Sequence, residues 1–230
     1  MICVAISATD ANSAIEKSHK AIQKGADFIE VRIDHFNDPF TADFVKLVKE
    51  ISSKLILTIR KPDEGGKFAF EEAQRIELIQ KCINAQTFAV DLEFSIDADA
   101  LTKLIQEAKK NQVKIILSFH DFQKTPDIPK MKEIILDAVK KDANYVKIIG
   151  TAASIEDNLK MLSLPQFAKE NHIEIVAFAM GGKGTVSRIL SPIFGAAFTF
   201  AALDKPTAPG QISIDDMKKN LQTFTSYSRK

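Results

Sequence analysis

Short apolar segments rich in Val, Ile and Phe alternate with longer amphipathic segments from one end of the 230-residue chain to the other. The apolar segments have the length and composition of buried strands, and the segments between them repeat apolar residues with the spacing of one helix face. Eight strands are predicted, at Ile2–Ser7, Phe28–Asp34, Lys54–Arg60, Phe88–Phe94, Lys114–Phe122, Tyr145–Thr151, Glu174–Met180 and Ala197–Leu203. Helices are predicted at Ala11–Lys24, Phe40–Ile51, Glu71–Asn84, Ala98–Asn111, Lys130–Lys141, Ser154–Asn171, Thr185–Phe194 and Ile214–Phe224.

Strands that alternate with helices at this spacing pair in parallel through right-handed crossovers. Eight such units in 230 residues fit a closed (β/α)8 barrel, the TIM barrel. An open doubly wound sheet is the alternative, but the first predicted strand is not followed by the G-x-G-x-x-G turn of a dinucleotide site. The chain has no internal linker or low-complexity stretch, so we expect residues 1–230 to form a single domain.

Charge and cysteine content narrow the class of protein. The 31 basic and 30 acidic side chains nearly cancel and form no long block of one sign, which argues against a nucleic-acid partner. No apolar run is long enough to span a bilayer, and we expect no signal peptide or membrane anchor. Cys3 and Cys82 are too few for a disulfide framework and lack metal-ligand spacing. These features predict a cytoplasmic protein with no metal site.

Ionisable residues occupy one face of several predicted strands, while apolar residues occupy the other face. Side chains two positions apart share a face, so Glu30, Arg32 and Asp34 lie together, as do Asp91 and Glu93. The same alternation gives shared faces to Thr58 with Arg60, to Ser118 with His120, and to Tyr145 with Lys147 and Ile149. If the apolar faces meet the helices, the charged faces point into the barrel. There they must pair with each other, as a network that only fills the barrel, or with a ligand.

Six segments of the chain resemble type I 3-dehydroquinate dehydratase, the Schiff-base enzyme of the shikimate pathway, and they occur in the family's order over nearly the whole chain. These segments are Glu30-Val31-Arg32-Ile33-Asp34, Thr58-Ile59-Arg60 with Glu64-Gly65-Gly66, Ser118-Phe119-His120-Asp121-Phe122, Val146-Lys147, Met180-Gly181 with Ser187-Arg188, and Thr207-Ala208-Pro209-Gly210-Gln211. The resemblance implies dehydration of 3-dehydroquinate to 3-dehydroshikimate in a barrel of this class. It also implies a homodimer, and we expect the predicted helix Ile214–Phe224 and its neighbouring loop to form the contact.

By this resemblance, the ketone of the substrate condenses with Lys147 to give an iminium, which then serves as an electron sink, so that no cofactor is required. An amine must be neutral to attack a ketone, and the apolar neighbours Val146, Ile148 and Ile149 are expected to disfavour its charged form. A lysine that extends to solvent is the alternative role for Lys147.

The resemblance makes His120 the general base that removes a proton next to the iminium carbon and then protonates the departing hydroxyl. Histidine titrates near neutral pH, so one ring can serve both steps. Glu64 matches the family's partner for this histidine and is expected to orient the ring and favour its protonated form. A core histidine with a structural role is the alternative for His120.

The remaining matched positions are expected to bind substrate. Arg188 matches the family's carboxylate clamp, because a planar guanidinium can hold both oxygens of a carboxylate. The other expected contacts are Glu30, Arg32, Arg60, Gln211, Thr207, Ser7, Met180 and Phe200. For the two strand arginines, mutual neutralisation with neighbouring carboxylates is a second role that does not exclude the first. The segment from Ala202 to Gln211, with its two prolines, is expected to form a loop that closes over the site.

Two other functions are compatible with parts of the pattern. A class I aldolase also uses a Schiff-base lysine in a barrel, but it does not account for Thr207-Ala208-Pro209-Gly210-Gln211 together with Ser118-Phe119-His120-Asp121-Phe122. A binding or scaffold barrel descended from the enzyme would be expected to lose Lys147 or His120, and both are present.

Overall fold

A computed structural model describes residues 1–51 and 54–227, apart from the side chains of residues 225 and 227. Its parallel strands follow one another around a barrel in the order β7-β6-β5-β4-β3-β2-β1-β8. The strands are β1 (Ile2–Ser7), β2 (Phe28–Arg32), β3 (Lys54–Thr58), β4 (Ala89–Glu93), β5 (Lys114–His120), β6 (Tyr145–Thr151), β7 (Glu174–Met180) and β8 (Thr199–Ala201). A backbone hydrogen bond of 2.8 Å from the amide of Ala197 to the carbonyl of Ile175 joins the two ends of the sheet. The prediction of a (β/α)8 barrel is therefore confirmed.

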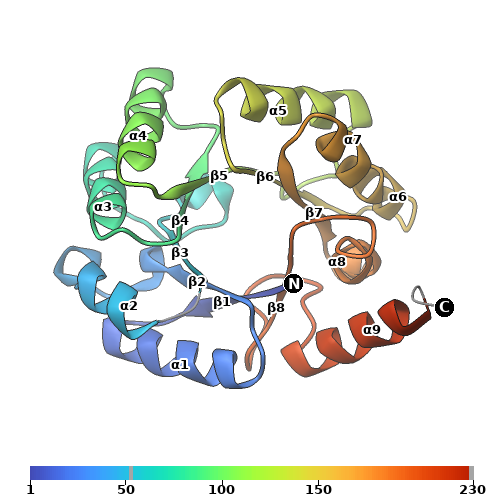
Figure 1. Cartoon of the computed structure of the whole chain (residues 1–230), viewed down its shortest axis with the longest axis horizontal. Helices are drawn as coiled ribbons and strands as arrows, with labels where there is room; N and C mark the ends of the chain where they lie inside the picture. The colour runs from blue at the N-terminus through green and yellow to red at the C-terminus, as the bar shows by residue number, and fades with distance from the viewer. Residues whose placement is uncertain (52–53, 228–230) are drawn as a thin grey trace.

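The helices form a ring outside the strands (Figure 1). They are α1 (Ala11–Gln23), α2 (Phe44–Glu50), α3 (Glu72–Asn84), α4 (Ala98–Lys110), α5 (Ile128–Lys140), α6 (Asp157–Leu162), α7 (Leu164–Glu170), α8 (Thr185–Leu190) and α9 (Ile214–Tyr227). Aspartate side chains cap several of their N-termini, as Asp10 does by accepting a hydrogen bond from the amide of Ser13 at 2.9 Å. The apolar outer faces of the strands pack against this ring and form the larger of two cores.

Several predicted boundaries differ from the structure where the chain leaves the barrel. The second strand ends at Arg32 rather than Asp34, because Ile33–His35 turns into a 3-10 helix, η1. The third strand ends at Thr58, and residues Pro62–Glu64 form another 3-10 helix, η3. The single helix predicted over Ser154–Asn171 is two helices that meet at Ser163, since Pro165 lies in the first turn of α7, where its missing N–H is tolerated.

The inside of the barrel has an aromatic layer at the N-terminal ends of the strands. The rings of Phe28 and Phe198 stack with centroids 4.5 Å apart, and Tyr145 meets Phe198 edge-on at 5.9 Å. Lys54 places its ammonium 4.7 Å from the ring centroid of Phe28, and Lys114 lies over neighbouring rings in the same way. This layer closes one end of the barrel and leaves the C-terminal end for polar side chains.

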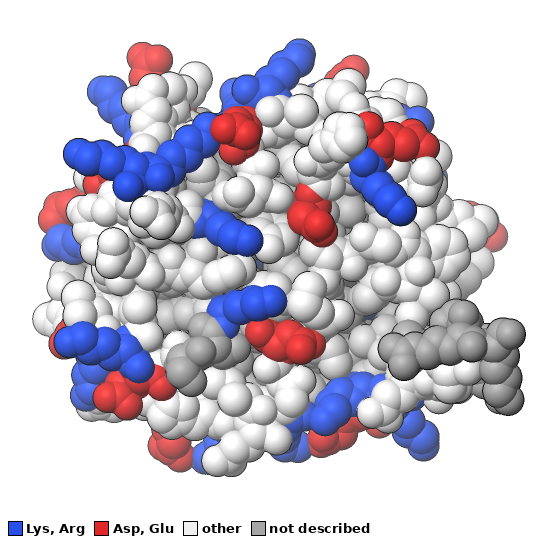
Figure 2. Space-filling view, in the orientation of Figure 1, with Lys and Arg blue, Asp and Glu red and all other residues white. Residues whose placement is uncertain are grey.

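Surface charge is mixed on the face seen in Figure 2, where lysine and arginine side chains are interspersed with carboxylates. None of the helices in the described ranges is long and apolar enough to cross a membrane.

Candidate active site

Lys147 lies in the middle of β6 and points into the barrel, where it is only 5% exposed. Its ammonium nitrogen is 3.2 Å from Oε1 of Glu30 and 3.0 Å from Oδ2 of Asp91, and it lies 4.7 Å from the ring centroid of Phe200. The apolar surroundings expected from the sequence hold only in part, because Val146 faces the helices with the outer core. Two carboxylates therefore lie within hydrogen-bond distance of the Lys147 amine.

Asp91 contacts three polar groups of the cavity. Besides its contact with Lys147, it accepts a 2.5 Å hydrogen bond from Oγ of Ser118 and lies 2.8 Å from Nη2 of Arg60. Burial alone would raise the pKa of Asp91, but the charges of Arg60 and Lys147 outweigh it and hold that pKa below its usual range. Asp91 is therefore an ionised carboxylate in direct contact with the reactive amine.

His120 ends β5, and its Nδ1 lies 3.3 Å from Oε2 of Glu64, which η3 carries over from the neighbouring loop. The other oxygen of Glu64 accepts a 2.6 Å hydrogen bond from Oγ of Ser95. Burial, with the nearby charges of Arg60 and Lys147, lowers the pKa of His120 well below its usual value, while burial raises that of Glu64. The free ring is therefore neutral at pH 7 and able to accept a proton, whereas the sequence suggested that Glu64 would favour the charged ring.

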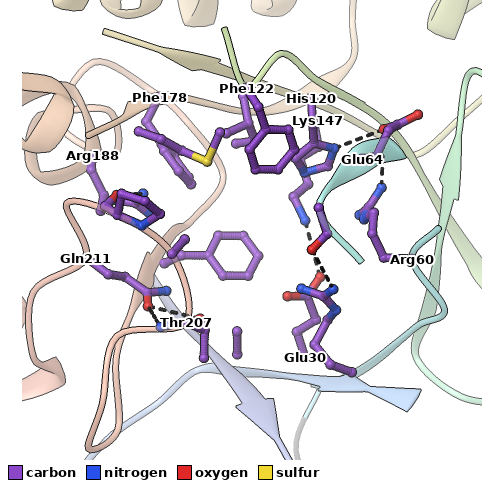
Figure 3. A pocket seen from close by; sticks show the side chains of 18 residues that line it. Glu30, Arg60, Glu64, His120, Phe122, Lys147, Phe178, Arg188, Thr207 and Gln211 are labelled. Atoms are coloured by element: carbon purple, nitrogen blue, oxygen red, sulfur yellow. Dashed lines mark hydrogen bonds and ion pairs between the residues drawn. The ribbon is translucent and has the colours of Figure 1, made fainter. Parts of the chain in front are cut away.

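Arg188, on α8, lies across the cavity from Lys147 and His120 (Figure 3). Its side chain is 1% exposed, its guanidinium carbon lies 4.1 Å from the ring centroid of Phe178, and Nη2 donates to the carbonyl of Pro209 at 3.3 Å. No carboxylate of the described residues lies within 4.0 Å of this guanidinium, and its Nε has no hydrogen-bond partner among them. Burial lowers the pKa of Arg188 to about 9. A buried cation without a counter-ion is well suited to receive an anionic group from a ligand.

The other two arginines of the cavity already have acidic partners. Arg60 contacts Asp91 and lies 3.6 Å from Glu64. Burial acts to lower the pKa of Arg60, but the negative charges of Asp91, Glu93 and Glu30 outweigh it and raise that pKa. Arg32 is paired with Asp34.

The loop after β8 covers the cavity and is joined to the loop after β7. Oε1 of Gln211 accepts hydrogen bonds from the amide of Thr207 at 2.7 Å and from its hydroxyl at 3.0 Å. The amide of Gly181 donates to the carbonyl of Pro209 at 3.2 Å. Gly210 has a φ of +76°, and a Cβ there would lie 2.3 Å from the carbonyl oxygen of Gly181, so only glycine allows this close approach. The expected covering loop thus closes against α8.

One cavity brings together all of the residues expected from the sequence except Ser7. They are Glu30, Arg32, Arg60, Glu64, His120, Lys147, Met180, Arg188, Phe200, Thr207 and Gln211. Ser7, the last residue of β1, instead lines a neighbouring hollow beside Lys17 and residues 203–207. On the same strand face, Ala5 is the residue that reaches the cavity.

Two further residues organise the site and were not selected from the sequence. Ser118 accepts a 2.8 Å hydrogen bond from Nη1 of Arg60 while it donates to Asp91. Arg75, on α3, is fully buried; it pairs with Glu93 and donates to the carbonyl of Ile59 at 3.0 Å. A basic residue on the apolar stripe of a predicted helix was the available signal for Arg75.

The described part of the chain contains no group of three or more His, Cys, Asp or Glu side chains placed to hold a metal ion. The polar atoms of the cavity come instead from Lys147, His120 and the surrounding carboxylates and arginines. This arrangement places a buried lysine, a histidine and a buried arginine around one cavity of a (β/α)8 barrel, as in barrel enzymes with a site at the C-terminal ends of the strands.

Comparisons with known proteins place the chain within this class. The family model for type I 3-dehydroquinase matches residues 2–228. The 3-dehydroquinate dehydratase of Thermococcus gammatolerans is 35% identical over 222 residues, which cover 96% of this chain and 97% of the relative. The crystal structure of 3-dehydroquinate dehydratase from Geobacillus kaustophilus superposes with a TM-score of 0.92 at 27% identity, covering 99% of this chain and 91% of the other. The Clostridium difficile type I enzyme, crystallised with covalently modified comenic acid, gives a TM-score of 0.90 at 26% identity, with coverage of 98% and 92%. The chain belongs to the type I 3-dehydroquinase family, a family of hydro-lyases.

Proposed function

We propose that this protein dehydrates 3-dehydroquinate to 3-dehydroshikimate in the shikimate pathway, through a Schiff base on Lys147. One observation carries the proposal: Lys147 and the neutral His120 face Arg188, a buried arginine with no acidic partner among the described residues, across one cavity (Figure 3). A substrate with a ketone at one position and a carboxylate at another matches these two walls. Residues 1–230 then act as a single catalytic domain.

The first step needs a neutral amine. Lys147 passes a proton to a neighbouring carboxylate, and the neutral amine attacks the ketone carbon to give a carbinolamine. The hydroxyl of the carbinolamine takes that proton back from the carboxylate and leaves as water, which gives the iminium. Asp91 and Glu30, at 3.0 and 3.2 Å from the amine nitrogen, then lie beside the new cation. They stabilise the iminium, because a buried positive charge in this position is already compensated by two carboxylates.

The second step is a syn elimination. His120 takes the proton from the carbon next to the iminium carbon, and the electron pair of that C–H bond moves toward the iminium nitrogen to form an enamine. The enamine then expels the hydroxyl, which leaves as water after it accepts the proton from His120. Glu64 orients the ring through Nδ1. Hydrolysis of the product iminium returns the free Lys147 and releases the enoate.

The other residues of the cavity hold the substrate. Arg188 binds the carboxylate, while Gln211 and Thr207 contribute polar groups from the covering loop. Glu30, Arg32 and Arg60 surround the ring hydroxyls, and Met180 and Phe200 supply apolar contact. The covering loop excludes water, which protects the iminium from hydrolysis before elimination.

The test is formation of the conjugated enoate, followed by its ultraviolet absorbance after purified protein is mixed with 3-dehydroquinate. Product formation is expected without added metal, and Lys147→Ala should reduce turnover by at least about 10⁴-fold. Lys124→Ala is the matched control, since Lys124 is exposed on the loop after β5. Reduction with borohydride should attach substrate mass to the wild type and to the control, but not to Lys147→Ala. Folded wild-type protein that gives neither product nor adduct would refute the proposal.

We also infer that the protein acts as a cytoplasmic homodimer that contacts its partner through α9 and the neighbouring loop. Phe224 on α9 is 42% exposed and offers an apolar side chain for such a contact. Light scattering after gel filtration should give twice the chain mass, and Phe224→Asp should shift it toward the monomer. An unchanged dimer in that variant would place the contact elsewhere.

A further inference from the structure

Three arginines line the cavity, and they differ in what their guanidinium groups already hold. Arg60 contacts Asp91, and Arg32 contacts Asp34, whereas Arg188 has no acidic partner among the described residues. A substrate carboxylate that enters this cavity therefore meets one arginine that is available and two that are occupied.

Asp34 is placed to occupy one edge of the Arg32 guanidinium. It lies in η1 directly after β2, and its side chain is fully buried. Arg32 donates to it from Nε at 2.9 Å and from Nη2 at 2.7 Å, which is the two-point geometry of the strongest arginine–carboxylate pairs. The backbone amide of Lys67 donates a third hydrogen bond, at 2.9 Å. Burial acts to raise the pKa of Asp34, but the hydrogen bonds and charge of Arg32 outweigh it and lower that pKa.

Nη2 of Arg32 also donates to the carbonyl of Gly65 at 3.5 Å, so Nη1 is its one nitrogen without a hydrogen-bond partner among the described residues. A single nitrogen can donate to a hydroxyl, but it cannot hold both oxygens of a carboxylate. Glu30 is already engaged elsewhere and does not replace Asp34 as the partner of Arg32. Its Oε1 accepts hydrogen bonds from the hydroxyl of Thr58 and from the amine of Lys147.

We propose that Asp34 determines the orientation of the substrate by occupying Arg32, so that Arg188 is the arginine that receives the carboxylate. The role of Arg188 in this inference rests on the proposed function. If Arg32 were free, its planar guanidinium would offer a second carboxylate site on a different side of the same cavity. A substrate bound there would direct its ketone away from Lys147, so Asp34 is a positioning residue that acts through Arg32.

Binding of inorganic sulfate to the folded protein tests this without turnover. In Asp34→Asn, the amide keeps an acceptor for Lys67 but loses the charge, and titration calorimetry should show sulfate binding about tenfold tighter than in the wild type. The double variant Arg32→Met with Asp34→Asn should return to the wild-type affinity. Asp63→Asn, an exposed acid in η3, is the matched control and should not change it.

Kinetics should then show kcat and KM for 3-dehydroquinate falling together in Asp34→Asn, the signature of a non-productive binding mode. A merely structural role would lower kcat and stability with no gain in sulfate affinity, and that result would overturn the proposal. If Asp34→Asn does not fold, the sulfate affinities of two single arginine variants test the proposal instead. Arg32→Met should leave sulfate affinity unchanged, and Arg188→Met should abolish it; loss of affinity in Arg32→Met would also overturn the proposal. Since sulfate binding requires no reaction, these outcomes are independent of whether dehydration itself is observed.

Discussion

The two ends of the barrel interior are built from the same strands but filled with opposite chemistry. On β2 the inward residue changes from Phe28 to Glu30 in one two-residue step, and on β6 it changes from Tyr145 to Lys147. Below this level, stacked aromatic rings fill the barrel. Above it, charged groups hold each other in place around a cavity.

The two ends also contribute differently to folding. Each aromatic side chain buried in the lower layer stabilises the fold by about 1.5–3 kcal/mol through the hydrophobic effect. In the upper layer, desolvation of each charge opposes the gain from pairing, and Arg188 has no paired carboxylate in the part of the chain that the structure describes. The comparison indicates that the lower layer provides the stability that allows the upper layer to keep costly groups in fixed positions.

Replacement of His120 should separate activity from stability most sharply. His120→Ala removes the general base, so kcat is expected to fall by about 10²–10⁴-fold. Because the ring is buried and neutral, the thermal unfolding midpoint should change little by comparison. Steady-state kinetics and thermal denaturation measure both quantities, with His19→Ala on the exposed face of α1 as control. An active His120→Ala variant would remove this residue from the mechanism.

Replacement of Phe28 should lower stability while leaving the activity of the folded protein unchanged. Phe28→Ala leaves a cavity in the aromatic layer and is expected to lower the free energy of unfolding by about 3–5 kcal/mol. The protein that remains folded should keep the kcat of the wild type, since Phe28 does not line the catalytic cavity. Denaturant unfolding and the rate per folded molecule test this. A large loss of kcat in the folded variant would show that the two layers are not separable.

Much of this division could be predicted from the sequence, because it follows from local periodicity. Alternation along Phe28–Arg32 and Tyr145–Thr151 predicts which side chains point inward, and the alternation of strands with helices predicts the barrel. The resemblance then identified Lys147 and His120 as residues of one cavity. Ser7 does not line that cavity. Periodicity predicts the face of a strand on which a side chain lies, but not how far along the barrel axis it lies.

The pairing of charges could not be predicted, because it depends on side chains that reach between elements. Arg75 extends from a helix to Glu93 inside the barrel, and Asp34 binds both its neighbour Arg32 and the distant backbone of Lys67. Sequence spacing carries no information on such contacts. The resemblance gave Arg188 as the carboxylate clamp, but the structure was needed to show that it has no acidic partner among the described residues.

Arg188 offers a test of whether a binding residue of the upper layer destabilises the fold. Arg188→Met should raise KM by about 10–100-fold, the typical loss of a hydrogen-bonded charge. The same variant should unfold at a higher temperature, because an unpaired buried cation has been removed. Arg60→Met is the matched comparison: it removes the partner of Asp91 and should lower the unfolding temperature instead. If Arg188→Met unfolded at a lower temperature than the wild type, the buried Arg188 would not destabilise the fold.

The smallest expected effect concerns pH and follows from the lowered pKa of His120. Since burial and the neighbouring cations keep this ring neutral, the acid limb of kcat/KM, which reports the free enzyme, should lie below pH 6.5. Stability should follow the same group. The folded state binds this proton at lower pH than the unfolded chain does, so stability falls as pH drops from about 6.5 toward the folded pKa.

An NMR titration of the histidine ring protons can measure this directly, with His120→Ala used to assign the signal. A midpoint below 6.5 is expected for His120 in the free protein. A midpoint at or above 6.5 would mean that Glu64, at 3.3 Å, stabilises the charged ring more than burial and the cations oppose it. With a midpoint above 7, the ring would begin the reaction at pH 7 largely protonated, as an acid rather than a base. Its proton would have to move to another group, such as Glu64, before the C–H bond could be broken.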